Sequence, residues 1–358
     1  MVNSLISIIL TVLIFGVLIG IHELGHYVAA RIFGVGIVEF SIGMGPKIFT
    51  KQGKHNDFSI RALPIGGFVN MVGEYSEELE ERHRDKRPLD SFKAWKRLII
   101  GVAGPLMNII FAFIIMIVYV VCSPSLASTV VADKYETDDM QNVSFAYGLM
   151  PGDEIVKVGG RNIHVYYDLS YEISAHGNQP IDLEVIRNGE RIKLEGVRFP
   201  VQEQQGSEFG CVDFKIYLKQ KNFANVLNDA FYQPISIVYV TVDSLIDTFT
   251  GRYDIGESVG GPIAIGGAVG DTIADSDSFA ETVSSLAVLT VFISVSLGVC
   301  NLLPIPVLDG GMILFCIIEM IIGRPIKKEV QNVITNIFAM LLILLMVLVC
   351  IKDVIGLF

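Results

Sequence analysis

Four stretches of this chain are long and apolar enough to cross a lipid bilayer as helices, and they constrain its fold more than any other feature. They cover residues 4–24, 98–122, 284–307 and 331–351. The hydrocarbon core of a bilayer is about 30 Å thick, which roughly 20 apolar residues of helix can span. Composition agrees, since 51% of the 358 residues are hydrophobic and only 18% are charged. The sequence therefore predicts a polytopic α-helical membrane protein with four transmembrane helices.

The connections between these stretches predict the orientation of the chain. Residues 31–97 contain twelve Lys and Arg residues, and the third connection contains Arg324, Lys327 and Lys328. Short basic loops tend to stay in the cytoplasm, whereas long domains are translocated largely regardless of their charge. We therefore expect both basic loops to be cytoplasmic, and residues 123–283 and both termini to be extracytoplasmic.

Charge also limits the partners that this chain can bind. The formal net charge is −11, from 38 acidic and 27 basic residues, which argues against a nucleic-acid partner because binding one would require a dominant basic face. The lipid bilayer is the partner that composition predicts. A fifth apolar stretch, Phe231–Phe249, contains Asp243 and Asp247. We interpret it as an amphipathic helix at the membrane surface rather than as a span.

Strand patterns are concentrated in one part of the long third segment. Between residues 130 and 200 the sequence alternates apolar and polar residues, as in IDLEVIRNGERIKLEGV, where Arg187–Glu190 forms a turn between two alternating runs. Such alternation around a short Asn-Gly turn is typical of a β-hairpin. The sequence therefore predicts a small extracytoplasmic β-rich domain inserted between the second and third spans.

The first span contains a motif with metal chemistry. His22-Glu23-Leu24-Gly25-His26 fits H-E-x-x-H, which on a helix places two imidazoles one turn apart on one face to bind zinc, with the glutamate as general base. Ionisable groups in a membrane helix are costly and indicate function by default. The alternative is a solvated helix end at which the three side chains only reach the aqueous phase.

A catalytic zinc site needs a third protein ligand, and Asp309 is the best candidate. It lies in NLLPIPVLDGG, where Pro304 and Pro306 interrupt an apolar helix. Irregular backbone at membrane depth is tolerated where it is buried in protein or lines a wet cavity. With four spans, this segment reaches the same membrane depth as His22 and His26. The alternative role for Asp309 is to cap the helix that follows.

These motifs resemble the site-2 protease family of intramembrane zinc metalloproteases, and within it the bacterial regulator of sigma-E protease group. Both parts of the family's site are present: H-E-x-x-H, and N-x-x-P-x-x-x-L-D-G from Asn301 to Gly310. VEFSIGMGPKIF, FSIRALPIGGFVNM and AGPLMN lie between them in the family's order. The resemblance implies Zn²⁺ bound by His22, His26 and Asp309, with Glu23 catalytic, in a bacterial plasma membrane with the active site near its cytoplasmic side.

The resemblance also suggests residues that contact substrate. FSIRALPIGGFVNM, residues 58–71, would form a membrane-associated β-hairpin with a turn at Pro64, Gly66 and Gly67, whose edge could pair with an unwound substrate. The alternative is a hairpin that only supports the fold. Asn301 and Asn108 are further candidates, although a helix–helix hydrogen bond is an equally good role for Asn108. Residues 258–270 would form a tight packing turn.

The inserted domain resembles a circularly permuted bacterial PDZ domain through YGLMPGDEIVKVGGRNI. In this family such a domain is expected to filter substrates by size, and the alternative is a rigid spacer. The sequence predicts four consecutive parts. Residues 1–125 form the first half of the protease core, with a β region at about 36–75, and residues 126–220 form one PDZ domain. Residues 221–283 form an amphipathic linker, and residues 284–358 form the second half of the core.

The function implied is hydrolysis of peptide bonds within transmembrane segments, with anti-sigma factors or signal-peptide remnants as substrates. Two other classes stay open at this stage. One is a catalytically silent membrane scaffold that binds chain termini through its PDZ domain. The other is a transporter that uses the His/Glu/Asp site for an ion, although four spans without an inverted repeat argue against it.

Overall fold

A computed structural model describes residues 2–73, 86–135, 142–204, 207–250 and 262–355. Two compact units make up the chain: residues 1–114 together with 259–358 form the membrane unit, and residues 115–258 form the β unit. Each is described by itself. Residues 74–75 of the predicted β region and 258–261 of the predicted packing turn lie outside the described residues.

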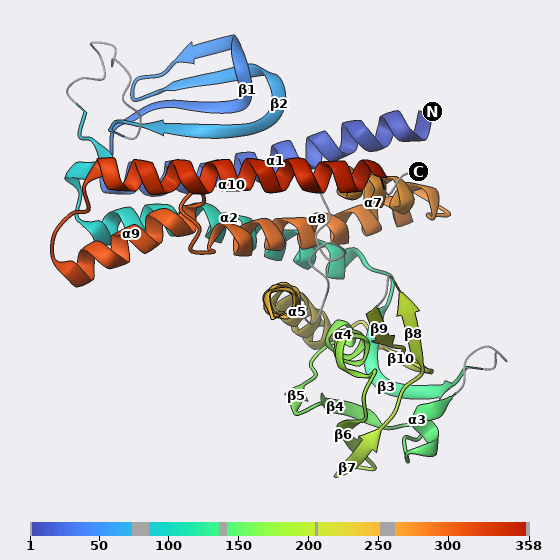
Figure 1. Ribbon diagram of the computed structural model, residues 1–358. Helices are drawn as coiled ribbons and strands as arrows, with labels where there is room; N and C mark the ends of the chain where they lie inside the picture. The colour runs from blue at the N-terminus through green and yellow to red at the C-terminus, as the bar shows by residue number, and fades with distance from the viewer. Residues whose placement is uncertain (1, 74–85, 136–141, 205–206, 251–261, 356–358) are drawn as a thin grey trace. The chain divides into compact units, whose positions relative to one another are not determined.

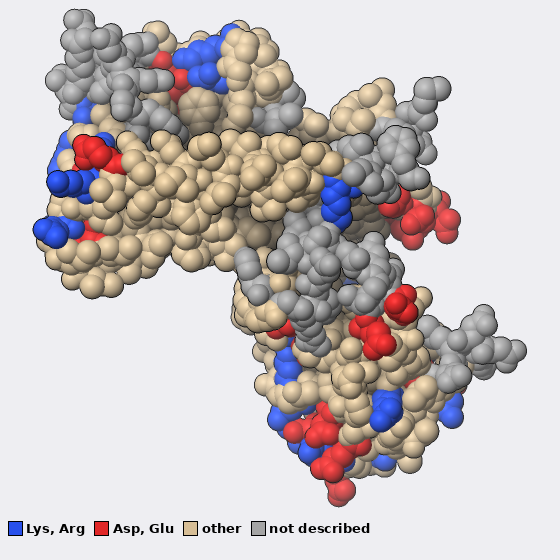
Figure 2. All heavy atoms as spheres, in the orientation of Figure 1, with Lys and Arg blue, Asp and Glu red and all other residues tan. Residues whose placement is uncertain are grey.

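Four helices in the described residues are long and apolar enough to cross a membrane, as the sequence predicts. They are α1 (Val2–Phe33), α2 (Ala94–Cys122), α8 (Phe279–Asn301) and α10 (Lys328–Ile355). In Figure 1 their axes are nearly aligned, and in Figure 2 the face formed by α10 is almost free of charged side chains between the helix ends. An uncharged helix face of this kind fits a lipid environment.

The bounds of the third span differ from those predicted from the sequence. Helix α8 ends at Asn301 rather than at residue 307, because Pro304 and Pro306 lack the N–H groups that a continuing helix needs. The chain forms turns as far as Leu308, and α9 (Asp309–Ile322) then begins. Helix α9 ends at Ile322 and is followed by Gly323, whose φ of 75° gives the left-handed conformation common after a helix C-terminus.

The predicted packing turn at residues 258–270 is wrong over the part that the structure describes. Residues Pro262–Ala274 form the apolar helix α7, which packs against α1, where the Ser7 hydroxyl donates to the carbonyl oxygen of Gly266 at 2.8 Å. Gly270 also faces Ser7, since a Cβ at this position would lie 3.4 Å from the hydroxyl oxygen. The small residues therefore permit a close helix–helix contact rather than a turn.

Strands β1 (Ile37–Gln52) and β2 (Asp57–Met71) form an antiparallel sheet in the membrane unit. The predicted turn at Pro64–Gly67 does not join two paired strands. Both halves of β2 pair with the first part of β1, since Glu39 lies opposite both Asp57 and Asn70. The first part of β1 is therefore central, and the last residues of β2, Gly67–Met71, form an edge of the sheet.

The β unit contains a sheet with the strand order β10-β3-β4-β6-β7, and β5 pairs with β4. The strand bounds are β3 (Leu126–Lys134), β4 (Glu154–Val158), β5 (Arg161–Asn162), β6 (Ile181–Arg187), β7 (Glu190–Val197) and β10 (Phe214–Lys219), with a separate pair β8 (Val201–Gln204) and β9 (Ser207–Gly210). The predicted hairpin at Arg187–Glu190 is confirmed as the β6–β7 turn. Helices α3 (Val143–Ala146) and α4 (Tyr166–His176) complete a core that includes Leu149, Ile155 and Leu183.

Helix α5 (Phe223–Phe249) contains the fifth apolar stretch and starts eight residues before it. It is not among the four candidate spans of the described residues. One face packs on α4, where the Tyr171 hydroxyl donates to Asp243 at 2.9 Å, while Phe231 and Ile246 on the helix are each 54% exposed. Its attachment at the membrane surface stays a prediction.

Candidate metal centre

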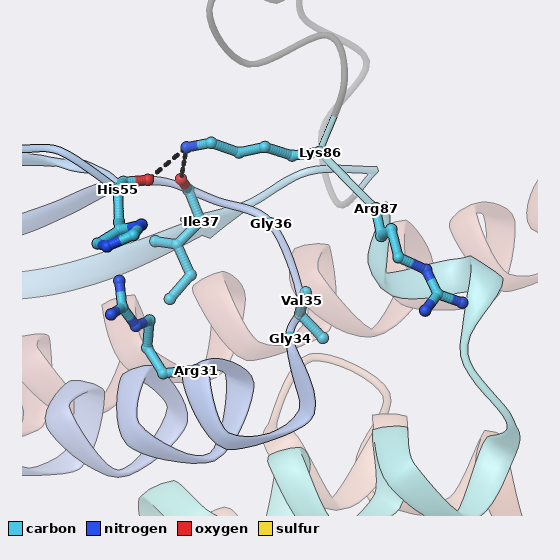
Figure 3. Close-up of a pocket in the computed structure, with 8 residues that line it drawn as sticks. All are labelled: Arg31, Gly34, Val35, Gly36, Ile37, His55, Lys86 and Arg87. Atoms are coloured by element: carbon cyan, nitrogen blue, oxygen red, sulfur yellow. Dashed lines mark hydrogen bonds between the residues drawn. The ribbon is translucent and has the colours of Figure 1, made fainter.

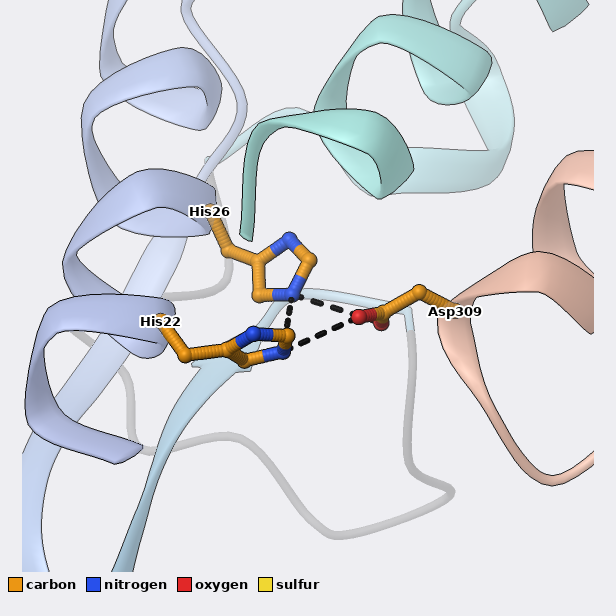
Figure 4. A group of neighbouring side chains, drawn as sticks. All are labelled: His22, His26 and Asp309. Carbon is orange, nitrogen blue, oxygen red and sulfur yellow. Dashed lines mark hydrogen bonds and ion pairs between the residues drawn. The ribbon is translucent and has the colours of Figure 1, made fainter. Parts of the chain in front are cut away.

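The polar turn of α1 carries two buried histidines. His22 and His26 are each 7% exposed and project from successive turns of one helix face, as residues four apart must. Both imidazoles point toward the start of α9, where Asp309 lies (Figure 4). The structure therefore brings together the three side chains that the sequence singles out, from helices separated by most of the chain.

The three side chains converge to within hydrogen-bond distance of one another. Nε2 of His22 lies 2.9 Å from Oδ2 of Asp309, Nε2 of His26 lies 3.3 Å from Oδ1, and the two Nε2 atoms are 3.2 Å apart. Ligand bonds of about 2.0–2.1 Å in a tetrahedral site place ligand atoms about 3.3 Å apart. Among the described residues this is the one group of at least three His, Cys, Asp or Glu side chains arranged to hold a metal ion.

The hydrogen bonds around His26 show why this cluster suits a cation. Nδ1 of His26 lies 2.8 Å from the carbonyl oxygen of Ile100, an acceptor only, so the ring donates through Nδ1 and its neutral form keeps a lone pair on Nε2. That lone pair faces a carboxylate and a second imidazole nitrogen. Oδ2 of Asp309 is buried, and the polar group beside it is Nε2 of His22 at 2.9 Å, which donates to it only in the tautomer that carries the ring proton on Nε2. A bound cation would accept the lone pairs of both ring nitrogens and of the carboxylate at once.

The backbones of α1 and α2 come close together at this point because both carry glycine there. A Cβ on Gly25 would lie 2.2 Å from the carbonyl oxygen of Ala103, and a Cβ on Gly104 would lie 2.3 Å from Nε2 of His26. Neither distance is sterically possible. Small residues at a membrane helix interface permit this approach, and these two glycines therefore give the imidazoles their place between the helices.

The segment that carries Asp309 depends on two further glycines. A Cβ on Gly310 would lie 1.9 Å from the carbonyl oxygen of Leu303, and one on Gly311 would lie 2.4 Å from Cα of Pro306. The start of α9 thus folds back tightly onto the proline-containing turns. Leu308 rather than Asp309 is the N-cap residue, and no side chain caps the helix. The side chain of Asp309 turns toward the histidines, so a capping role is not its function here.

Glu23 lies between the metal centre and the sheet. Its Oε2 accepts a hydrogen bond from the backbone N–H of Val69 at 3.0 Å. A Cβ on Gly67 would lie 3.8 Å from Cγ of Glu23, so the glycine leaves room beside the carboxylate. The edge of β2 therefore borders the glutamate that the motif assigns to proton transfer.

The remaining predicted residues occupy different surroundings. Gly66 has a φ of 84° and lies against Met44, and Pro64 precedes it within β2. Asn301 is the last residue of α8, partly buried, and makes no side-chain hydrogen bond among the described residues. Asn108 is fully buried, with its Nδ2 3.4 Å from Nδ1 of His22. Only Asn108 contacts a member of the cluster through a hydrogen-bonding group.

A pocket of about 330 Å³ lies beyond the end of α1 and is lined by none of the cluster residues. Arg31, His55, Lys86 and Arg87 contribute basic side chains to it. Figure 3 shows that the Lys86 ammonium group donates to the carbonyl oxygens of Ile37 and His55. Lys86 thus ties the sheet to the chain that leads into α2, which is a structural role.

Sequence motifs drew attention to the ligands but not to the groups that hold them. The Ile100 carbonyl is invisible in a sequence because every residue carries one. Ser294 and Gly298 of α8 contact α2 around Asn108 and were also missed. For Gly104 a signal was present, because GVAGPLMN gathers three small residues, Gly101, Ala103 and Gly104, within one helical turn, and small residues are enriched at helix interfaces in membranes.

Comparison with known proteins gives one consistent result. Residues 10–345 match the model of peptidase family M50. A Clostridium acetobutylicum protein, whose name assigns it provisionally to the zinc metalloproteases, is 34% identical over 98% of both chains. A similarly named protein of Agrobacterium fabrum is 30% identical over 90% of this chain and 88% of its own. A metalloprotease of Caulobacter vibrioides is 28% identical, with 92% and 91% of the two chains covered.

Proposed function

The chain belongs to peptidase family M50, the site-2 protease family, and from this membership we propose that it is a zinc endopeptidase that hydrolyses peptide bonds within transmembrane segments. A metalloprotease activity follows from the family itself. The intramembrane position of the reaction is the proposed part. It is supported by the place of His22 and His26 in a helix long and apolar enough to span a bilayer.

One observation carries the proposal. His22, His26 and Asp309 point three acceptor atoms at a common centre, beside a glutamate on the same helix. Two imidazoles and one carboxylate are an established donor set for catalytic zinc. A zinc ion held by these side chains would supply Lewis-acid chemistry, polarising the scissile carbonyl group and making a water molecule acidic near neutral pH.

Glu23 would be the proton-transferring residue. Its carboxylate lies one residue from His22 on the same helix and is held by the Val69 N–H. That bond fixes one oxygen, Oε2, and leaves Oε1 to accept the proton of the attacking water and to pass it to the leaving amine. Glu23 belongs to the same helix as His22 and His26, so the fold sets its position and no loop has to move to bring it to the site.

A transmembrane substrate must be unwound before it can be cleaved, because its carbonyl groups are bonded within a helix. The edge of β2 at Gly67–Met71 suits an extended peptide, which would replace the lost helical hydrogen bonds. The N–H of Val69 points to Glu23 and therefore away from β1. In this proposal the bend at Pro64 and Gly66 shapes the edge, and Asn301 contacts the substrate backbone.

Several finer features of the function extend this proposal. The chain would work in a bacterial plasma membrane, with its basic loops in the cytoplasm and its β unit and termini outside. Anti-sigma factors or signal-peptide remnants would be its substrates. The β unit would act as a PDZ domain that filters substrates by size, and its small sheet with α3 and α4 is compatible with that fold.

The direct test is cleavage of two synthetic substrates by the purified full chain. One carries a candidate sequence within a single transmembrane segment, and the other carries the same sequence in a soluble linker. We expect cleavage of the first only, and a loss of about 10²- to 10⁴-fold in Glu23→Gln, as for removal of a general base. Equal cleavage by wild type and Glu23→Gln, or cleavage of the soluble linker alone, would refute the proposal.

A second experiment tests the pairing edge. The Val69 N–H lies outside the ladder, so Val69→Pro removes it while keeping the sheet. N–H groups alternate along a strand, so the N–H of Asn70 points into the ladder and Asn70→Pro serves as the control that disrupts the sheet. We expect Val69→Pro to fold like wild type, to keep its zinc and to cleave slowly. Because Val69→Pro also removes the hydrogen bond to Glu23, loss of pairing is read from a raised KM for the transmembrane substrate rather than from kcat. An unchanged KM in Val69→Pro would contradict substrate pairing at this edge.

The alternative function is a silent scaffold that binds peptides through the β unit. A scaffold needs neither a general base nor converging metal ligands, so Glu23 beside the convergent His22, His26 and Asp309 supports the protease proposal over the scaffold. A wild-type protein that binds terminal peptides but neither zinc nor transmembrane substrates would favour the scaffold.

A further inference from the structure

The second nitrogen of each histidine ligand decides how well the ligand is oriented. A histidine that binds zinc through Nε2 carries its ring proton on Nδ1, and this N–H requires an acceptor that fixes the tautomer and the ring orientation. For His26 the acceptor is the carbonyl oxygen of Ile100, at 2.8 Å. His22 needs an equivalent partner.

Asn108 is the group that faces Nδ1 of His22. Its side-chain Nδ2 lies 3.4 Å from that nitrogen. The residue is 0% exposed, and its Oδ1 is buried without a hydrogen-bond partner among the described residues. The Asn108 side chain thus has an unused acceptor atom, Oδ1, close to the His22 ring, whose Nδ1–H needs an acceptor. The two ends of a carboxamide have nearly the same shape, so a half-turn about its last bond places oxygen where nitrogen lies.

We propose that Asn108 is a positioning residue of the metal centre, whose side-chain oxygen accepts the Nδ1–H of His22 and so directs Nε2 toward the metal ion. This inference rests on the proposed zinc site. It assigns the two histidines matching partners on one helix, a backbone carbonyl of α2 for His26 and a side-chain amide of α2 for His22. It also replaces substrate contact as the role of Asn108, since a fully buried side chain does not face a substrate.

Helix α8 holds Asn108 in place. The Ser294 hydroxyl, itself fully buried, donates to the backbone carbonyl oxygen of Asn108 at 2.9 Å. One turn later, a Cβ on Gly298 would lie 2.9 Å from the carbonyl oxygen of Pro105 and 3.5 Å from Cβ of Asn108. Helix α8 therefore packs closely against the backbone of α2 around Asn108, and none of these contacts involves the side-chain amide.

The test is zinc affinity, measured by competition with a chelator on the full chain in detergent for wild type and four variants. Asn108→Leu and Asn108→Ala remove the acceptor, and the second only deletes atoms, so a failure of the leucine variant to fold leaves the comparison intact. Asn108→Asp keeps an acceptor oxygen. Ser294→Ala is the packing control, because it changes the same helix contact without touching the amide.

We expect zinc binding to weaken by about 10- to 100-fold in Asn108→Leu and Asn108→Ala, the usual cost of losing such an outer partner. Asn108→Asp and Ser294→Ala should stay within a few-fold of wild type. The visible absorption of the Co²⁺-substituted protein should change in the first two variants only, because it reports the geometry of the ligands.

Two results would overturn the inference. One is wild-type zinc affinity and an unchanged Co²⁺ spectrum in Asn108→Ala. The other is a loss in Asn108→Asp as large as that in Asn108→Ala, since packing rather than hydrogen bonding would then be responsible. A wild-type chain that binds no zinc would instead contradict the proposed function, so the two failures are distinguishable.

Discussion

The two units of this protein bury carboxylates in different ways. In the β unit, Asp153 is 0% exposed and receives hydrogen bonds from the Arg187 guanidinium at 2.7 and 2.8 Å and from the Met150 N–H at 2.9 Å. In the membrane unit, the carboxylate of Asp309 faces two imidazole nitrogens instead, Nε2 of His22 at 2.9 Å and Nε2 of His26 at 3.3 Å, and the second of these presents a lone pair in the neutral ring.

Other buried acids show that this difference is not one of membrane against water. Asp213 in the β unit accepts from the backbone N–H and the hydroxyl of Ser144 at 2.8 and 2.6 Å. Glu319 in the membrane unit pairs with Arg97 and also accepts from the Ile326 N–H at 3.1 Å. Both have donors as partners, as buried polar groups normally do. A buried carboxylate that faces two histidine ring nitrogens one helix turn apart instead indicates a cation site.

The largest expected effect comes from closing the space between α1 and α2. Gly104→Ala places a methyl group on Nε2 of His26, where a Cβ would lie only 2.3 Å away, so the ring must leave the cluster. We expect loss of bound zinc and a fall in cleavage of more than about 100-fold. The measurements are metal content and cleavage of the transmembrane substrate.

Gly20→Ala is the matched control on α1. Nothing lies within 4 Å of a Cβ at Gly20, and alanine favours a helix over glycine. This variant should keep both zinc and activity. Equal activity of Gly104→Ala and Gly20→Ala would contradict the close contact between Gly104 and His26.

A smaller effect is expected from breaking a satisfied carboxylate in the β unit. Asp153→Ala leaves the partly buried Arg187 unpaired and the Met150 N–H without its acceptor, which should cost about 2–3 kcal/mol of local stability. Hydrogen exchange of the β4 and β6 amides in the full chain would measure this loss.

Asp153→Ala also tests whether the buried carboxylates of the two units act independently, because its zinc content should equal that of wild type. Lys193→Ala, which breaks exposed ion pairs with Asp182 and Glu195, is the control and should change neither property. Loss of zinc in Asp153→Ala would show that the two kinds of buried carboxylate are not independent.

The smallest effect concerns the β1–β2 sheet and depends on pH. Burial acts to raise the pKa of Glu39, but hydrogen bonds from Ser59, Lys47 and Arg61 outweigh burial and hold the pKa below its ordinary value of 4.5. A lowered pKa means that the carboxylate stabilises the fold fully above that ordinary value and loses this effect as the pH falls through the lowered one.

We therefore expect amide protection factors in β1 and β2 to fall as the pH drops below about 4.5, and to fall less in Glu39→Gln, which has no carboxylate to protonate. Protection in the β unit strand β7 provides the reference. A fall of equal size in wild type and Glu39→Gln would show that other groups control the acid sensitivity of the sheet.

The sequence predicted the features that local composition determines. Apolar length located the four spans, and H-E-x-x-H placed two imidazoles on one helix face because helical periodicity is fixed. The end of the third span at Asn301 was missed, since hydropathy continues through Leu302–Leu308 while the prolines end the helix. Helix α7 was missed because its glycines resemble a turn and function as a packing surface.

Features that depend on contacts between distant segments could not be read from the chain. The two halves of β2 lie on opposite sides of β1, and local turn chemistry at Pro64–Gly67 does not reveal which strand each half pairs with. The residue pattern left Asp309 open as either ligand or helix cap. Only the position of the Asp309 side chain beside the two histidines separates these roles. The tight fold of Gly310 and Gly311 onto the proline-containing turns shapes the start of α9 that carries it.

The most direct test of the central claim is the zinc content of the purified full chain, by elemental analysis, in wild type, Glu23→Gln, Asp309→Ala and the β-unit control Asp213→Ala. If His22, His26 and Asp309 form the metal centre, wild type, Glu23→Gln and Asp213→Ala hold about one zinc per chain, and Asp309→Ala is depleted. Full zinc occupancy in Asp309→Ala, or none in wild type, would contradict the account.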